Sequence, residues 1–131
     1  MFSIKQSTAT AILNQIVTAA GSGAKINLYD GNIPASSDAA LSNNNVLARV
    51  ACGNPCATVS GRVMTFSAFE ANVAVEREGT VTFFRLVTSG GNTVLQGTVP
   101  DTGGTGNLKL NTIQLQAQGT VTVDSATISI A

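Results

Sequence analysis

Cys52 and Cys56 are the residues whose side chains could do chemistry most directly, because a thiolate is both a nucleophile and a metal ligand. They stand in the sequence Cys-Gly-Asn-Pro-Cys, and the 131-residue chain has no other cysteine and no histidine. Two thiolates are half of a zinc site, so a zinc centre would need an oligomer that pools cysteines from several copies. A disulfide between them is feasible if their Cα atoms come within about 7 Å. The remaining interpretation is two reduced thiols, buried or in a loop, as a reducing compartment favours.

Carboxylates and glycines form two further clusters. Glu76 and Glu78 flank Arg77, and such a group could in principle transfer protons or bind a cation, but Gly79 follows and favours a solvated turn. The segment 101–106 is rich in glycine, but no Gly-Lys-Ser/Thr follows it, so we expect a loop and no phosphate cradle. Serine and threonine are abundant, yet without histidine or a Ser-x-x-Lys arrangement none has a base to activate it. The sequence therefore predicts no enzyme, no cofactor and no small-molecule substrate.

Composition argues against several classes of partner. Seven Lys and Arg balance seven Asp and Glu, and charged residues make up only 11% of the chain. Without a positive surplus, we do not expect a nucleic-acid binder. No stretch reaches the ~18 apolar residues of a membrane span, and Asn14 and Gln15 interrupt the apolar run that imitates a signal peptide. We therefore expect a protein made in the cytoplasm, and its near-zero net charge favours association.

The first element expected is a helix. Apolar residues from Ala9 to Ala20 recur at spacings of three and four, which predicts a helix over residues 7–20 with Ser7 or Thr8 as its N-cap. One short helix cannot bury its apolar stripe alone. It must pack on the sheet of its own chain or on a neighbouring subunit, and we favour its own sheet.

From residue 24 onward the pattern is short strands separated by polar and glycine-containing turns. About eight strands are expected, at 25–29, 46–51, 63–69, 71–76, 80–88, 93–99, 107–115 and 120–130. Residues 52–62 are expected to form a loop. No helical pattern separates successive strands, so a parallel sheet is not expected. The predicted fold class is all-β: an antiparallel β-sandwich or jelly roll with one short N-terminal helix. It is a single domain, with an arm and helix over 1–23 and the sandwich over 24–131.

Adjacent aromatic residues give the best hint of an interface. Phe83 and Phe84 follow each other in a predicted strand, so their side chains point to opposite faces. One is expected in the core, and the other must be covered by the helix, a loop or another subunit. Phe84 is taken as a candidate partner contact. Phe2 and Ile4 are the other candidates, because an apolar chain end before the helix could dock on a partner.

The order of segments along the chain resembles a known group of proteins. The helix ending in Gly-Ser-Gly is followed by Ala-Lys-Ile-Asn-Leu-Tyr-Asp-Gly at 24–31. Later come Gly-Thr-Val-Thr-Phe-Phe-Arg-Leu at 79–86, Val-Leu-Gln-Gly-Thr-Val at 94–99 and Val-Thr-Val-Asp-Ser-Ala-Thr-Ile-Ser at 121–129. This order resembles small structural proteins encoded among the head genes of tailed bacteriophages. The resemblance covers nearly the whole chain, but the loop that holds both cysteines is not part of the pattern.

The resemblance implies a role in the virion. Some small virion proteins of this kind are jelly-roll cement, or decoration, proteins that sit on the capsid surface and brace the shell. It implies that this chain binds the major capsid protein as a homo-oligomer, a dimer or trimer, and an exposed strand edge could pair with a shell protein. The alternative is a tail, neck or baseplate component. A carbohydrate-binding sandwich module is weakened because the chain has no Trp and a single Tyr, Tyr29, to stack on sugars.

Overall fold

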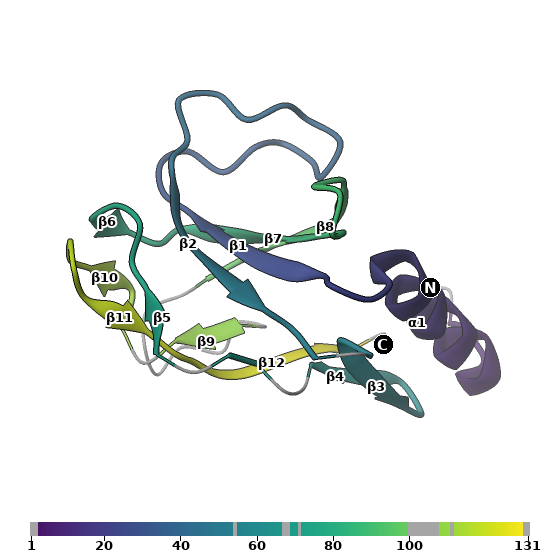
Figure 1. The fold of residues 1–131 in the computed structure, drawn as a ribbon. Helices are drawn as coiled ribbons and strands as arrows, with labels where there is room; N and C mark the ends of the chain where they lie inside the picture. The colour runs from purple at the N-terminus through teal and green to yellow at the C-terminus, as the bar shows by residue number, and fades with distance from the viewer. Residues whose placement is uncertain are drawn as a thin grey trace.

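The computed structural model describes residues 3–53, 55–66, 69–70, 72–99, 108–110 and 112–129. In these ranges the chain is mostly β with one short helix near the N-terminus, which confirms the predicted all-β class at this level (Figure 1). The elements are α1 (Gln6–Ala20), β1 (Lys25–Tyr29), β2 (Val46–Ala51), β3 (Ala57–Ser60), β4 (Val63–Phe66), β5 (Val73–Ala74), β6 (Gly79–Thr80), β7 (Phe83–Val87), β8 (Thr93–Thr98), β9 (Leu108–Leu110), β10 (Gln114–Leu115), β11 (Thr120–Val121) and β12 (Val123–Ser129).

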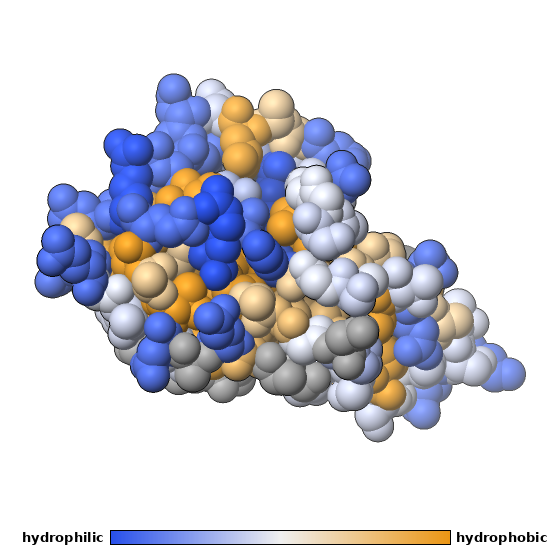
Figure 2. Space-filling view, in the orientation of Figure 1, coloured by the Kyte–Doolittle hydropathy of each residue, from blue (hydrophilic) through white to orange (hydrophobic). Residues whose placement is uncertain are grey.

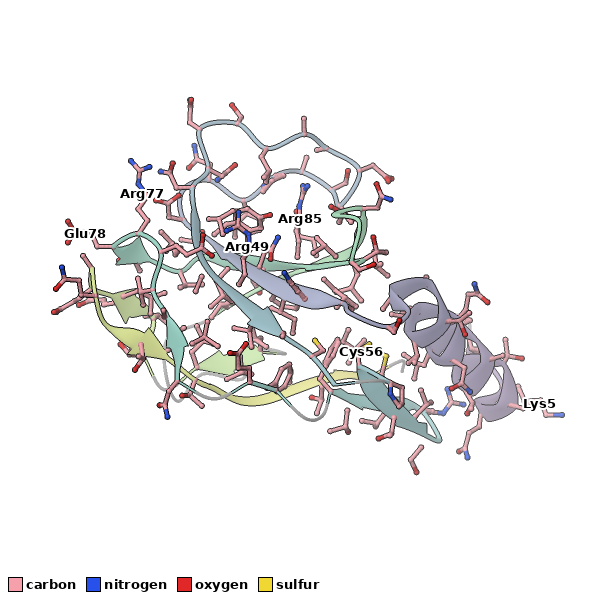
Figure 3. All side chains as sticks on the ribbon, in the orientation of Figure 1. Lys5, Arg49, Cys56, Arg77, Glu78 and Arg85 are labelled. Atoms are coloured by element: carbon pink, nitrogen blue, oxygen red, sulfur yellow. The ribbon has the colours of Figure 1, made fainter. Side chains whose placement is uncertain are left out.

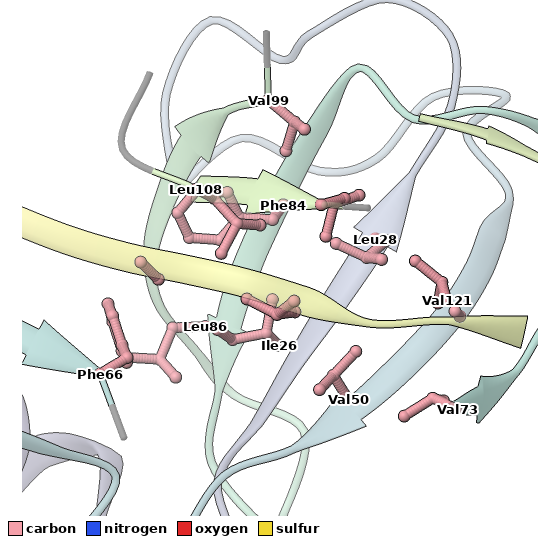
Figure 4. Close-up of a cluster of buried hydrophobic side chains, with 14 of the residues drawn as sticks. Ile26, Leu28, Val50, Phe66, Val73, Phe84, Leu86, Val99, Leu108 and Val121 are labelled. Atoms are coloured by element: carbon pink, nitrogen blue, oxygen red, sulfur yellow. The ribbon is translucent and has the colours of Figure 1, made fainter. Parts of the chain in front are cut away.

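The strands form two four-stranded sheets, in the orders β2-β1-β7-β8 and β3-β4-β12-β9, and two short sheets that pair β10 with β6 and β11 with β5. All pairs among the described strands are antiparallel. One apolar cluster joins the two larger sheets: Ile26, Leu28 and Phe84 come from one sheet and Phe66 and Leu108 from the other (Figure 4). Burial of this shared core is what holds the two sheets together.

The helix packs on strands of its own chain, as expected. It contacts β3, β4 and β8, and it buries Ala9, Leu13 and Ala20, which lie along the predicted apolar stripe. Gly21 follows with a positive φ of 69°, a conformation that costs glycine little, and the helix ends there.

The predicted N-cap is wrong. The helix already begins at Gln6, so Lys5 occupies the N-cap position, where no side chain caps the helix. A tertiary contact anchors the start of the helix instead: Nη2 of Arg62 donates to the carbonyl oxygen of Ile4 at 2.5 Å. One turn later, Oγ1 of Thr10 donates to a carbonyl of the turn between β3 and β4 at 2.6 Å.

The number of strands is higher than predicted. Residues 52–62 are not all loop, because β3 and β4 form a hairpin that turns at Gly61, whose φ is +60°. The strand predicted at 80–88 is two strands, since β6 pairs with β10 and β7 belongs to a larger sheet. The segment 107–115 is likewise divided into β9 and β10. In both cases the chain leaves one sheet and enters another, a change that local alternation of apolar residues does not record.

Candidate functional site

The two adjacent phenylalanines lie on opposite faces of β7, but not as assigned from the sequence. Phe84 is 1% exposed and belongs to the core between the sheets, so it is not available to a partner on the folded chain. Phe83 faces the other way and is also fully buried, with its ring stacked on Tyr29 at a centroid distance of 5.0 Å. The register between β7 and β1 determines which side chains of β7 face the core, because Phe84 lies opposite core residue Leu28.

A row of polar residues crosses the same outward face of this sheet. Asn27 of β1 lies directly opposite Arg49 of β2 and Arg85 of β7, and Arg85 lies opposite Gln96 of β8. Figure 3 shows Arg49 and Arg85 on the side of the sheet that faces the long loop between β1 and β2. This loop, residues 30–45, is called the cover loop below.

Arg85 fastens the cover loop to the sheet. It is only 5% exposed, and its Nη2 donates to the carbonyl oxygens of Ala39 at 2.7 Å and Ser36 at 3.4 Å. Its Nε donates to Oε1 of Gln96 at 2.9 Å, and Nε2 of Gln96 donates to the carbonyl oxygen of Pro34 at 3.0 Å. These acceptors are neutral, so the buried positive charge of Arg85 is stabilised by carbonyl oxygens and not by a carboxylate. Because most of these carbonyls belong to the cover loop, the conformation of the loop depends on this one side chain.

The base of the cover loop is closed by a second set of bonds. Nδ2 of Asn44 donates to the carbonyl oxygens of Asp30 at 2.6 Å and Asn32 at 2.9 Å. Oδ1 of Asp30 accepts from the backbone N–H of Asn45 at 2.7 Å, and Oγ1 of Thr82 donates to the carbonyl oxygen of Gly31 at 2.9 Å. The loop is therefore held at its base and along its length, on the outward side of the sheet (Figure 3).

The outer side of the cover loop carries exposed apolar residues. Ile33 is 46% exposed and Leu41 is 39% exposed, and Figure 2 shows apolar surface among hydrophilic residues at the top of the view, over this loop. A hollow of about 390 Å³ opens between the two arms of the loop, where Ile33 and Pro34 lie near Asn43. No charged residue is among those that line it. The lining of the hollow is therefore uncharged and includes one of the two exposed apolar side chains, Ile33.

The cysteines are free thiols in this structure. Cys56 is fully buried and belongs to the main apolar cluster, and Cys52 is half-buried beside that cluster. Burial raises the pKa of Cys52 to about 12, with the neighbouring Cys56 adding to the shift. Burial also raises the pKa of Cys56, and a backbone hydrogen bond partly opposes it. Both groups are therefore protonated at neutral pH. A protonated thiol is a poor nucleophile and a poor metal ligand.

The remaining candidates are dispersed over the molecule. Ile4 is half-buried just before α1, and its role as a partner contact stays a prediction. Phe2 and the glycine-rich segment 101–106 lie outside the described residues. Glu76 and Arg77 are exposed in a bend, as expected for a solvated turn, and Glu76 forms an ion pair with Arg49.

The described ranges contain no group of three or more Cys, Asp or Glu side chains placed to hold a metal ion. No helix in these ranges is both long and apolar enough to cross a membrane.

The cover loop and its arginine were not predicted as a site. Arg85 stands inside the most apolar strand of the sequence, and a charge in that position indicates a buried polar contact. Its partners are backbone carbonyls more than 45 residues away, and no residue type marks such acceptors in a sequence.

Comparison with known proteins identifies no relative: no family model matches the chain, and neither a curated protein nor a solved structure matches it significantly.

Proposed function

We propose that this chain is a structural protein of a tailed-phage virion, a capsid cement or decoration protein that binds the major capsid protein. It would be made in the host cytoplasm, would act on the capsid surface as a homo-oligomer, and would have no catalytic role. The resemblance in segment order suggests the virion. The cover loop suggests how the chain would contact other subunits.

The braced cover loop is the observation that carries this proposal. A binding surface loses less conformational entropy on association when it is already ordered, and Arg85 and Asn44 hold the loop in one conformation. Ile33 and Leu41 are both exposed on it, and fully burying a side chain of this size contributes about 1.5–3 kcal/mol. Such a contact is weak alone, but repetition over a shell adds avidity without requiring stronger single contacts.

The finer architecture is part of the proposal. We interpret the two four-stranded sheets with their shared core as a β-sandwich. Three pairs of successive strands, β1–β2, β3–β4 and β7–β8, are neighbours within one sheet. A jelly roll alternates successive strands between its sheets, so this order favours a sandwich of hairpins over a jelly roll.

Binding to empty shells tests the proposal. The double variant Ile33→Ser, Leu41→Ser removes both exposed apolar side chains of the cover loop without touching the residues that brace it. We expect it to fold with an unchanged melting temperature and to bind purified shells lacking the protein at least tenfold more weakly than wild type, an effect of about 1.4 kcal/mol or more.

The matched control is Ile12→Ser, which removes a side chain of α1 that is similarly exposed, at 42%. It should bind shells like wild type. Equal binding by the cover-loop variant would contradict the proposed docking loop. Binding of the wild type to purified tails, with none to shells, would instead favour the tail, neck or baseplate alternative.

A further inference from the structure

The two larger sheets end in four edge strands, β2 and β8 in one sheet and β3 and β9 in the other. The outer side of an edge strand carries backbone N–H and C=O groups without sheet partners, and folded proteins usually cover, shorten or charge such strands. The four edges of this protein differ in how they are protected.

Three of the edges are closed or short. On β2, the carbonyl oxygen of Leu47 accepts from the N–H of Glu76 at 2.8 Å, and that of Ala51 accepts from the N–H of Glu70 at 3.1 Å. Helix α1 packs against β3, which has only four residues, and β9 has three residues in the described part of the chain. These edges offer little backbone to a further strand.

The edge at β8 is different. It has six residues, and within the described ranges it pairs with β7 alone. The N–H of Val99 donates to the carbonyl of Thr82 at 3.1 Å, and Phe84 lies opposite Gly97 in the same register. Because hydrogen-bonded pairs alternate along antiparallel strands, the backbone groups of Gln96 and Thr98 point away from β7.

Nothing among the described residues occupies these outward groups. Helix α1 contacts β8, but no backbone hydrogen bond in the described part of the chain reaches the N–H or C=O of Gln96 or Thr98. The four central residues of the strand are half-buried. An additional strand would therefore complete hydrogen bonds and bury side-chain surface at once.

The sequence of β8, Thr-Val-Leu-Gln-Gly-Thr, has no charge and no proline. Two copies of this strand meet without electrostatic repulsion, and antiparallel pairing about a two-fold axis is self-complementary, so that Gln96 lies opposite Gln96 and exchanges two backbone bonds. Each copy brings a strand that β7 already holds in extended form, whereas a foreign segment would first have to be ordered.

We propose that β8 is a homodimer interface, at which two copies pair antiparallel and join their four-stranded sheets into one continuous sheet. The self-complementary, uncharged edge selects a second copy of this chain as the occupant. This inference rests on the sheet edge and not on the virion role, and its test uses the purified protein without particles, so the two can fail separately.

The test combines sedimentation with amide hydrogen exchange over a range of protein concentrations. We expect a monomer–dimer equilibrium in which the amides of Gln96 and Thr98 exchange more slowly as the dimer forms. Thr98→Lys places a charge on the open edge and should weaken dimerisation at least about tenfold. Thr58→Lys makes the same change at an exposed position of β3 and should leave the equilibrium unchanged.

Three results would overturn the interface. One is a wild-type protein that stays monomeric up to about 1 mM, a concentration at which a dimer with a dissociation constant below about 1 mM would be populated. Another is a dimer in which the amides of Gln96 and Thr98 exchange as fast as in the monomer. The third is a dimer that Thr98→Lys does not weaken. The exchange measurement uses wild-type protein only, so the proposal stays testable even if a variant folds poorly.

Discussion

The ring of Phe84 lies directly over Gly97, its cross-strand partner on β8. A Cβ atom at residue 97 would stand 2.6 Å from Cε1 and 2.8 Å from Cζ of that ring, closer than real Cβ atoms approach their neighbours. The absent side chain at Gly97 is therefore what allows the Phe84 ring to pack closely against the neighbouring strand. This contact couples the shared core to the strand that we propose as the dimer edge.

Gly97→Ala should accordingly destabilise the fold. The added methyl group must push the Phe84 ring or the backbone of β8 aside, and overpacking of a filled core costs about 1–3 kcal/mol. The measurement is the free energy of unfolding from urea denaturation. A stability within error of wild type would show that the ring does not lie where the structure places it.

Two variants test whether the destabilisation comes from the clash with the Phe84 ring or from replacing any glycine. Gly90→Ala meets only Oγ1 of Thr88 at 3.8 Å and should be tolerated. Phe84→Leu replaces the ring with a smaller aliphatic side chain and should reduce the additional cost of Gly97→Ala. The coupling between Phe84 and Gly97 can then be measured as a double-mutant cycle.

Arg85→Met should release the cover loop. It removes the bonds to Ser36, Ala39 and Gln96, and hydrogen bonds to a charged group contribute about 1.5–3 kcal/mol each in favourable cases. We expect a loss of about 2–4 kcal/mol in the free energy of unfolding and faster amide exchange within residues 30–45.

Arg49→Met is the matched control, because Arg49 lies in the same polar row but has a side chain that is 46% exposed in its ion pair with Glu76. Exposed pairs contribute about 0–1 kcal/mol, so this change should be nearly neutral. If the two variants were equally destabilising, the burial of Arg85 would not be the cause.

The thiols predict a specific loss of stability at high pH. In the unfolded chain Cys52 releases its proton near its ordinary pKa of 9.0, whereas burial raises the pKa to about 12 in the folded protein. Between these values the unfolded state binds fewer protons, so its free energy falls relative to the folded state and stability decreases as pH rises. Cys52→Ala should lose less stability over the same pH window in denaturation experiments, and an identical slope would contradict the buried thiol.

Much of the fold could be predicted because its signals are local. The helix follows from the spacing of Ala9, Leu13 and Ala20, and β7 follows from its apolar run. Strand β3 was missed, although β4 lies within the strand expected at 63–69, because turn residues before and after β3 mask a strand of only four residues. Which of the two adjacent phenylalanines enters the core depends on register with β1, and that is a long-range property.

The candidate site was less predictable for the same reason. The cover loop contains an Asp-Gly turn and several asparagines, which indicate a loop but not its conformation. Its conformation depends on Arg85 and Gln96, which bind backbone carbonyls 46 and 62 residues away in the sequence. Because every residue has a carbonyl, the partners of a buried arginine cannot be recognised from residue types.

The most direct measurement of the central claim is the number of copies of this protein in purified phage particles, relative to the major capsid protein, by quantitative mass spectrometry. A cement protein that repeats over the capsid surface should be present at a ratio near one copy per shell subunit, or a simple fraction of it. Absence from particles would contradict the virion role altogether. A dozen copies or fewer would contradict the cement role and favour a neck or tail position.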